Sequence, residues 1–191
     1  MSTKFWASTV EDAEDRFRHL LDIVPPNRSF FRDWMQKAEK SKDPLYFVVI
    51  DLKTGKIGGK QTWLRIDTDN GVIEIGHIYW GPLLSRKPAA TEAMYLFMKY
   101  AFEELGYRRY EWKCHSLNVR SRRAAERFGL SFEGIFRQDK VTKGRSRDTA
   151  WYACIDKEWP MLKAAYNQWL SPDNFDQSGV QIKKLEDFYV R

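Results

Sequence analysis

The fold is decided by residues 77–136, which read HIYWGPLLSRKPAATEAMYLFMKYAFEELGYRRYEWKCHSLNVRSRRAAERFGLSFEGIF. Their pattern predicts strand, loop, helix, strand, loop, helix and strand. The loop that ends at Ala90 opens a helix, and the first turn of a helix has unpaired N–H groups and a partial positive charge. Arg86 and Lys87 add two cations there. The loop is therefore a candidate anion site for a pyrophosphate, and an ordinary connection between strand and helix explains the same residues equally well.

The helix after this loop is apolar along most of its length. Small or apolar residues recur at helical spacing, namely Ala93, Leu96, Phe97, Tyr100, Ala101 and Leu105, with Met94, Met98 and Phe102 beside them. Gly106 follows as a typical residue at the end of a helix. Because so broad an apolar face needs burial, we expect this helix to pack against a sheet.

The rest of the chain organises around that sheet. The pattern predicts strands over residues 45–50, 59–66, 72–80, 108–115, 132–141 and 148–155, and helices over 29–39, 120–128 and 159–170. A good helix start also stands at Ser8–Asp12. Lys143–Arg145 forms a turn between the last two strands, and the segment after Pro172 is expected to be extended or loosely docked. Together these elements predict one α/β (α+β) domain.

The composition is that of a protein with a single core. The chain has 191 residues, 43% of them hydrophobic, and no run long and apolar enough to cross a membrane. Its N-terminal residues lack the apolar core of a secretory signal, so we expect a cytoplasmic protein. The net charge of +6 suits a polyanion such as CoA, an acidic protein or a nucleic acid. No RNA-recognition motif is present, so an RNA-binding module ranks last. Cys114 and Cys154 have no metal-ligand spacing and are interpreted as buried thiols, with no metal expected.

Short motifs follow one another in a fixed order from about Pro44 to Trp159. They are Glu74–Gly76, Pro88–Ala93, Ala101–Gly106, Asn118–Ser121, Gly129, Glu133–Gly134, Lys143–Arg145 and Arg147–Asp148. This set resembles the GNAT acyl-CoA N-acyltransferase superfamily, in its ribosomal-protein N-terminal acetyltransferase-like (RimJ/RimL-like) branch. The resemblance implies a single domain with a central mixed, mostly antiparallel twisted sheet and helices on both faces. That domain would span residues 1–170, with its first strand short or absent, and residues 171–191 would form a C-terminal tail.

The resemblance also implies acetyl-CoA as co-substrate. The residues that would hold it are Ile78, Tyr79, Trp80, Ser85, Arg86, Lys87, Ala89, Ala90, Thr91, Asn118 and Arg123. The phosphate loop departs from the pattern of the superfamily, because Ser85 stands where Gln or Arg is usual and Pro88 where the first Gly is usual. Ala90 fits the pattern.

Acyl transfer to an amine needs a base for the amine, a donor that polarises the thioester carbonyl, and an acid for the departing thiolate. On the resemblance, a backbone N–H of residues 78–80 would polarise the carbonyl, at a point where two strands separate to admit the pantetheine arm. Ser121 would protonate the thiolate, and Asn118 would bind the pantetheine or the acceptor. Both residues also fit their commonest uses, at a helix start and in a turn.

Two side chains are candidates for the base. Glu74 interrupts an apolar strand directly before Gly76, and a strand-edge carboxylate paired with a cation would explain it equally well. His77 is the second candidate, because an imidazole can act as a general base, but strict strand alternation points it away from Glu74. Only one of the two is expected to face the cleft, and this geometry favours Glu74.

The sequence therefore predicts an N-acyltransferase that moves an acetyl group from acetyl-CoA directly to a primary amine. A small-molecule acceptor is favoured over a protein N-terminus, because no extension for protein docking is evident. The alternative is a non-catalytic or altered-reaction CoA-binding or acyl-CoA-binding protein of the same fold. Neither a membrane nor a nucleic acid is expected as a partner, and the oligomeric state, including a homodimer, is left open.

Overall fold

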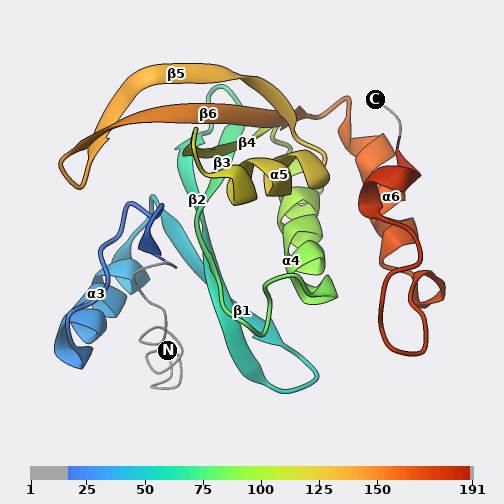
Figure 1. The fold of residues 1–191 in the computed structure, drawn as a ribbon. Helices are drawn as coiled ribbons and strands as arrows, with labels where there is room; N and C mark the ends of the chain where they lie inside the picture. Colours follow the sequence, from blue (N-terminus) through green and yellow to red (C-terminus); the bar gives the residue numbers. More distant parts are fainter. Residues whose placement is uncertain (1–16, 190–191) are drawn as a thin grey trace.

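The computed structural model describes residues 17–189, which form one six-stranded mixed sheet with helices on both faces (Figure 1). The strands are β1 Leu45–Asp51, β2 Lys56–Asp67, β3 Val72–Trp80, β4 Arg109–His115, β5 Ser131–Thr142 and β6 Arg145–Ile155. Their order in the sheet is β1-β2-β3-β4-β6-β5, and all neighbours are antiparallel except β3 and β4. The expected α/β class and the expected mixed, mostly antiparallel sheet are confirmed.

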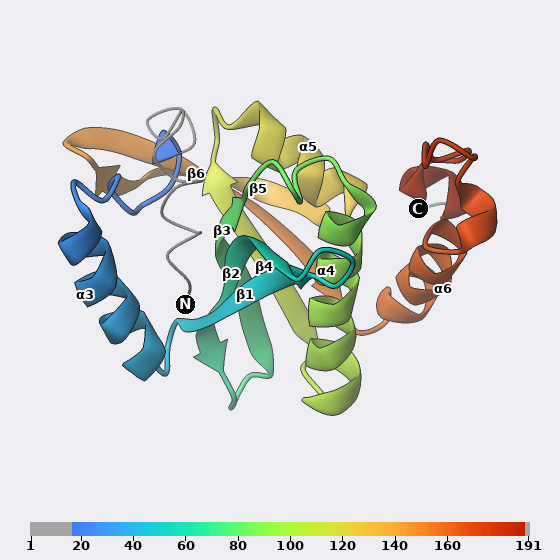
Figure 2. The same ribbon diagram turned by 90° about the horizontal axis from the view of Figure 1, so that it is seen from below.

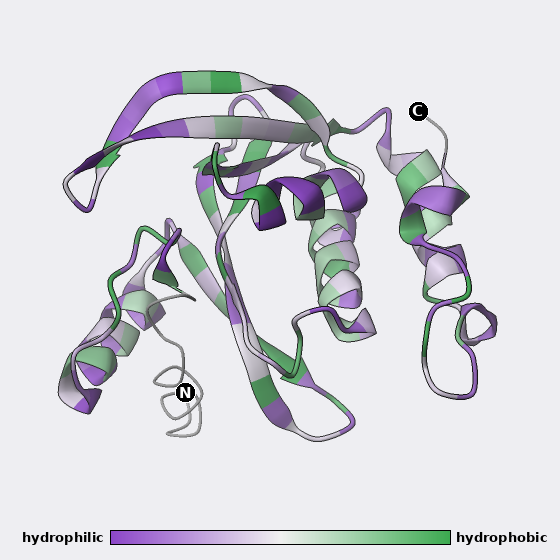
Figure 3. Ribbon diagram, viewed as in Figure 1, coloured by the Kyte–Doolittle hydropathy of each residue, from purple (hydrophilic) through white to green (hydrophobic). Residues whose placement is uncertain are grey.

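The helices divide between the two faces of the sheet. They are α3 Arg28–Lys40, α4 Pro88–Lys99, α5 Val119–Arg127 and α6 Trp159–Trp169. The strands lie between α3 and α4 in both ribbon views (Figure 2). Helices α4, α5 and α6 contribute to the main core on one face, whereas α3 closes a smaller cluster around Phe17, Phe31 and Tyr79 on the other. Helix α4 is apolar along most of its length and α5 is mostly hydrophilic (Figure 3).

Only part of the apolar face expected for helix α4 is buried, and the buried part includes Ala93 and Ala101. Met94 and Met98 are fully buried, whereas Leu96 and Leu105 are 53% and 44% exposed. A helix that is apolar nearly all round does not reveal from spacing alone which side is buried. In addition, the turn Tyr100–Glu104 is π-helical, which shifts the residues after it around the axis.

The C-terminal segment packs closely on α6, so the expectation of an extended or loosely docked tail is wrong. Leu185, in the short helical turn Leu185–Phe188, is fully buried in the main core. Trp169 Nε1 donates to Gln181 Oε1 at 2.9 Å, and the Tyr189 hydroxyl donates to the carbonyl of Arg127 at 3.2 Å. These anchors are single residues in a polar stretch and give no periodic signal.

The turn between β5 and β6 is confirmed at Lys143 and Gly144. Both residues have positive φ, 52° and 74°, as a two-residue hairpin turn of this kind requires. The helix start expected at Ser8–Asp12 and the short or absent first strand expected at Met1–Ala7 lie outside the described residues. Within residues 17–189, no helix is both long and apolar enough to cross a membrane.

Gly129→Ala should destabilise the fold more than Gly106→Ala does. The two glycines have φ of +87° and +67°, so a side chain costs roughly 1–2 kcal/mol at either position. A Cβ at Gly129 would also meet Leu162 at 2.5 Å, whereas no described atom lies within 4 Å of that position at Gly106. Overpacking adds roughly 1–3 kcal/mol. Urea unfolding gives the free energy of unfolding of both variants. Equal losses of stability would contradict the close packing of Gly129 on Leu162.

Candidate active site

The candidate active site begins where β3 and β4 stop pairing. Their parallel register covers only Val72–Ile75 against Arg109–Trp112, although β3 continues to Trp80 and β4 to His115. Beyond these pairs the strands diverge, which is the separation that the resemblance led us to expect. A cavity of about 850 Å³ opens there and is lined by residues from both faces of the sheet.

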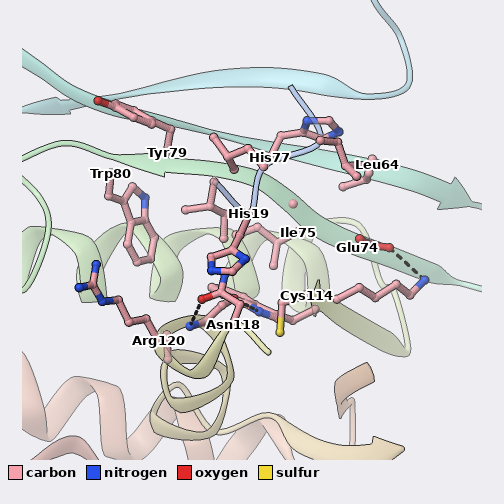
Figure 4. A pocket seen from close by; sticks show the side chains of 18 of the residues that line it. His19, Leu64, Glu74, Ile75, His77, Tyr79, Trp80, Cys114, Asn118 and Arg120 are labelled. Atoms are coloured by element: carbon pink, nitrogen blue, oxygen red, sulfur yellow. Dashed lines mark hydrogen bonds and ion pairs between the residues drawn. The ribbon is translucent and has the colours of Figure 1, made fainter. Parts of the chain in front are cut away.

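A β-bulge in β3 brings Glu74 and His77 into the same cavity, so the expectation that only one of them faces the cleft is wrong. Opposite Gln61 of β2, β3 has two residues, His77 and Ile78, and His77 takes a φ of 45°. The extra residue interrupts strict alternation and turns the imidazole toward the face that carries Glu74. Both side chains line the cavity (Figure 4).

The cavity collects more than half of the residues predicted for the site. The predicted residues that line it are Glu74, His77, Ile78, Tyr79, Trp80, Ser85, Asn118 and Ser121. They come from β3, from the loop before α4 and from the start of α5. The predicted residues that are not among its described lining residues are Arg86, Lys87, Ala89, Ala90, Thr91 and Arg123. These stand in the loop and first turn of α4, next to Ser85, or on the exposed side of α5.

Helix α4 starts beside the cavity with an uncapped N-terminus. Pro88 is in its first turn, and the N-cap Lys87 makes no side-chain capping hydrogen bond. The Ala90 N–H donates to the Lys87 carbonyl at 3.1 Å, and the Thr91 hydroxyl accepts from Arg127 Nη1 at 3.0 Å. The positive end of the helix dipole thus has no side-chain cap, and the exposed basic side chains of Arg86 and Lys87 stand next to it.

Helix α5 starts on the other side of the gap and positions Ser121. Asn118 caps the helix, because its Oδ1 accepts from the Ser121 N–H at 3.2 Å. Trp112 Nε1 donates to Ser121 Oγ at 3.1 Å, so the hydroxyl proton of Ser121 can be donated elsewhere. Burial raises the pKa of the Cys114 thiol, and a hydrogen bond with Ser121 offsets part of that rise. Cys114 and Cys154 are both buried thiols, as expected.

His77 has an acidic partner that the sequence pattern did not indicate. Its Nδ1 lies 3.3 Å from Asp22 Oδ2, which also pairs with Lys60 Nζ at 3.2 Å. Burial opposes the ionisation of Asp22, but the hydrogen bond from His77 and the charge of Lys60 outweigh it and hold the pKa of Asp22 well below its ordinary value. Burial lowers the pKa of Lys60, against the pull of Asp22. The Lys60 ammonium also lies 4.8 Å from the ring centroid of Trp34.

Glu74 is held by two cations. Its side chain is 3% exposed, Arg65 Nε lies at 2.6 Å and Lys113 Nζ at 3.0 Å. Lys113 Nζ also pairs with Glu111 at 2.7 Å and lies 3.5 Å from the ring centroid of Trp151. The ion pairing that we gave as the alternative explanation of Glu74 is therefore present. Removing one member of such a buried set leaves the others uncompensated, which is strongly destabilising.

The segment of residues 17–24 covers one side of the cavity. At the tip of the β5–β6 hairpin, Lys143 Nζ donates to the Phe17 carbonyl at 2.9 Å. His19 meets His115 edge-on, with ring centroids 5.7 Å apart, and His19 and Leu20 line the cavity (Figure 4). A contact from the far end of the sheet thus holds this segment in place.

Sequence reasoning missed most of the charged lining residues. Those missed are Arg65, Lys113, Arg120, Lys140 and Arg147. One signal was available, because Glu111 and Lys113 flank the core-facing Trp112 in a strand expected to be central. Charges at alternate positions of an interior strand indicate a polar layer on one face of the sheet. The segment that carries Asp22 has no comparable pattern.

The sequence of this chain and its structure are both similar to proteins of one family. The family model described as acetyltransferase (GNAT) domain matches residues 4–131. A GCN5-related N-acetyltransferase from Brucella melitensis is 62% identical, with a TM-score of 0.94 over 96% of this chain and 83% of that chain. A probable acetyltransferase (GNAT family) from Chromobacterium violaceum is 37% identical, with a TM-score of 0.76 over 81% and 77% of the two chains.

A curated relative matches over a shorter range. The uncharacterized N-acetyltransferase YnaD of Bacillus subtilis (strain 168) is 31% identical over 87 residues, which are 45% of this chain and 50% of that protein. The match thus spans about half the length of this relative. The family model covers more than half of the chain, and the similarity to the Brucella structure extends over nearly all of it. The chain therefore belongs to the acetyltransferase (GNAT) domain family.

Proposed function

We propose that this protein moves an acetyl group from acetyl-CoA directly to a primary amine, and that the acceptor is a small molecule. The observation that carries the proposal is the cavity between β3 and β4, which has an uncapped helix N-terminus beside it and the His77–Asp22 pair in its wall. The helix N-terminus suits a donor that carries phosphates, and the His77–Asp22 pair suits an amine that must lose a proton. Residues 19–21 line one side of the cavity, and the contact of Lys143 with Phe17 holds the start of this segment, which favours a small acceptor over a protein chain.

Two finer assignments accompany this proposal. The motifs from Glu74–Gly76 to Arg147–Asp148 support membership of the RimJ/RimL-like branch. The reduced state of Cys114 and Cys154 supports a cytoplasmic location, because cysteines remain reduced in that compartment.

The donor would lie across the start of α4 with its acetyl end in the gap. The first-turn amides of Ala89 and Thr91 would face the pyrophosphate, and Ala90 would allow it to approach closely because its side chain is small. The side chains of Ser85, Arg86 and Lys87 would lie around it. Across the gap, Asn118 and Arg123 of α5 would contact the pantetheine and the adenosine phosphates. The arm would then pass between Trp80 and Ser121, both of which line the cavity.

In the transfer step, the amine nitrogen attacks the thioester carbonyl carbon, a C–N bond forms, and the C–S bond breaks. A backbone N–H in Ile78–Trp80, next to the bulge, would stabilise the oxyanion. The Ser121 hydroxyl would protonate the departing thiolate, since its oxygen already accepts a hydrogen bond from Trp112. The amine proton passes to a base in the wall, and the products are an N-acetylated amine and CoA.

His77 is our first choice for that base, and Glu74 is the second. The two oxygens of Glu74 already accept hydrogen bonds from Arg65 at 2.6 and 3.0 Å, and Lys113 lies 3.0 Å away. His77 has one ring nitrogen toward Asp22 and its other side in the cavity. An acidic partner on one nitrogen fixes the ring and stabilises the cation that forms when the other nitrogen takes a proton.

Acetyl-CoA should stabilise the protein against heat, and amines should then trigger thiol release. At 100 times its dissociation constant, a ligand stabilises by about 2.7 kcal/mol. Exchanging Arg86 and Lys87 for Met should weaken this effect, because two cations leave the phosphate site. Lys53→Met, in the exposed turn after β1, is the matched control and should change nothing. Stabilisation without amine-dependent thiol release would favour the non-catalytic alternative, and absence of both would contradict the proposal.

His77→Gln should lower kcat by about 100-fold or more, with little change in the KM for acetyl-CoA or in the melting temperature. Glu74→Gln should chiefly lower stability, by about 3 kcal/mol, because Arg65 and Lys113 lose their counter-charge. Turnover at saturating substrates and thermal unfolding, measured on both variants, separate these effects. If Glu74→Gln loses turnover while its melting temperature is retained, Glu74 is the base and our order is reversed.

Asp22→Asn should slow turnover, and it should also destabilise the protein because Lys60 loses its partner. In a Lys60→Met background the loss of stability should shrink, while the loss of turnover should persist. Comparing all four proteins by kcat and by urea unfolding therefore separates the positioning of His77 from the burial of Lys60. Equal kcat in Lys60→Met and the double variant would remove Asp22 from the mechanism.

A further inference from the structure

The cavity wall contains a buried cation with a buried hydrogen-bond donor that has no partner among the described residues. Arg147, near the start of β6, is 7% exposed and lines the cavity. Within residues 17–189, its Nε has no hydrogen-bond partner. Burial lowers the pKa of this guanidinium, although Asp139 and Glu74 act in the opposite direction. Because buried charged groups are normally paired, Arg147 is arranged for a partner that this part of the chain does not supply.

The nearby carboxylates already have partners. Glu74 is held by Arg65 and Lys113. Asp139 Oδ2 accepts from the Thr149 hydroxyl at 2.7 Å. Glu74 is the one carboxylate among the described residues that line the cavity, and the cations that line the same end are Arg65, Lys113, Lys140 and Arg147. Arg65 pairs with Glu74, Lys113 with Glu111 at 2.7 Å, and Lys140 with Asp139 at 4.0 Å. Among the described residues, this leaves the positive charge of Arg147 without an ion-pair partner.

Arg147 lies at the open end of the gap between β3 and β4. It pairs in register with Lys140 of β5, and it stands two residues before Thr149, which pairs with His115 at the end of β4. Strand β6 therefore continues past the end of β4 and carries Arg147 beyond it. A ligand whose reacting atom lies between the strands could reach this guanidinium with another of its groups.

We propose that Arg147 binds a carboxylate of the acceptor, so that the substrates are amines that carry a carboxylate, as amino acids do, rather than polyamines. This assignment rests on the proposed function. A planar guanidinium can hold both oxygens of a carboxylate at once. A polyamine would leave Arg147 unpaired and would bring further positive charge beside it. During transfer the carboxylate remains unchanged at Arg147 while the amine nitrogen forms its bond to the acetyl carbon and CoA leaves.

The test compares amines in pairs that differ only in the carboxylate, such as phenylalanine with phenethylamine and lysine with cadaverine, and adds spermidine. Thiol release from acetyl-CoA should show a kcat/KM at least about 100-fold higher for the carboxylated member of a pair. Arg147→Met should abolish most of this preference by slowing the carboxylated amines alone, with the KM for acetyl-CoA unchanged. A preference for spermidine or for the decarboxylated amines in the unaltered protein would overturn the assignment.

Two further variants separate the role of Arg147 from that of general positive charge. Arg145→Met, at an exposed position on the same strand, removes an equal charge and should leave the preference intact. Arg147→Lys keeps the charge without the bidentate geometry and should restore part of the preference. Removing an unpaired buried charge should not lower the melting temperature of the free protein, so Arg147→Met is expected to fold. An equal loss of preference in Arg145→Met would point to general surface charge and would contradict the proposal.

A binding measurement keeps the assignment independent of turnover. In the presence of CoA, butyrate or succinate should raise the melting temperature saturably, and butanol should not. The shift should vanish in Arg147→Met and persist in Arg145→Met. If the carboxylates bind in this way but no amine is acetylated, the anion site stands and the proposed amine transfer fails. If phosphate shifts the melting temperature and the carboxylates do not, the carboxylate assignment is wrong.

Discussion

The parallel pairing of β3 with β4, and its end after Ile75 and Trp112, is the constraint on which the rest of the site depends. Because the two strands are parallel, their carboxyl ends open at the same edge of the sheet, and the helices that follow them, α4 and α5, both begin there. The parallel direction of β3 and β4 therefore brings two positive helix ends to one cavity. The bulge at His77 adds to this by turning a second titratable group into the same opening.

The face of the sheet opposite the main core is unusually rich in paired charges. Arg65, Glu74, Lys113, Glu111 and Arg109 form a continuous chain of ion pairs across β2, β3 and β4. Such a layer contributes little net stability compared with apolar packing, but each member fixes the position of the next. The wall beside the transfer site is therefore a rigid polar surface, in contrast to the apolar packing under α4 and α6.

The sequence was sufficient to predict the helices and strands, but not the β-bulge at His77 or the burial of Arg147. The strands at 72–80 and 148–155 and the helix at 159–170 were predictable, because periodic burial of apolar side chains determines them. The contact between His77 and Asp22 was not, since it needs a bulge that adds one residue and a segment 55 residues away. The burial of Arg147 also depends on three-dimensional packing, because its own strand pattern marks it only as one more basic residue.

Salt screens the charges at the two ends of the cavity to different extents. The basic side chains before α4 are exposed, so mobile ions screen their attraction for phosphates, over a distance of about 8 Å at physiological ionic strength. The ion pairs around Glu74 are buried and are screened much less. Added salt would thus weaken the binding of the proposed donor, while the shape of the opposite wall would persist. Ionic strength would therefore change the binding of the proposed donor and leave the cavity wall beside the proposed acceptor nearly unchanged.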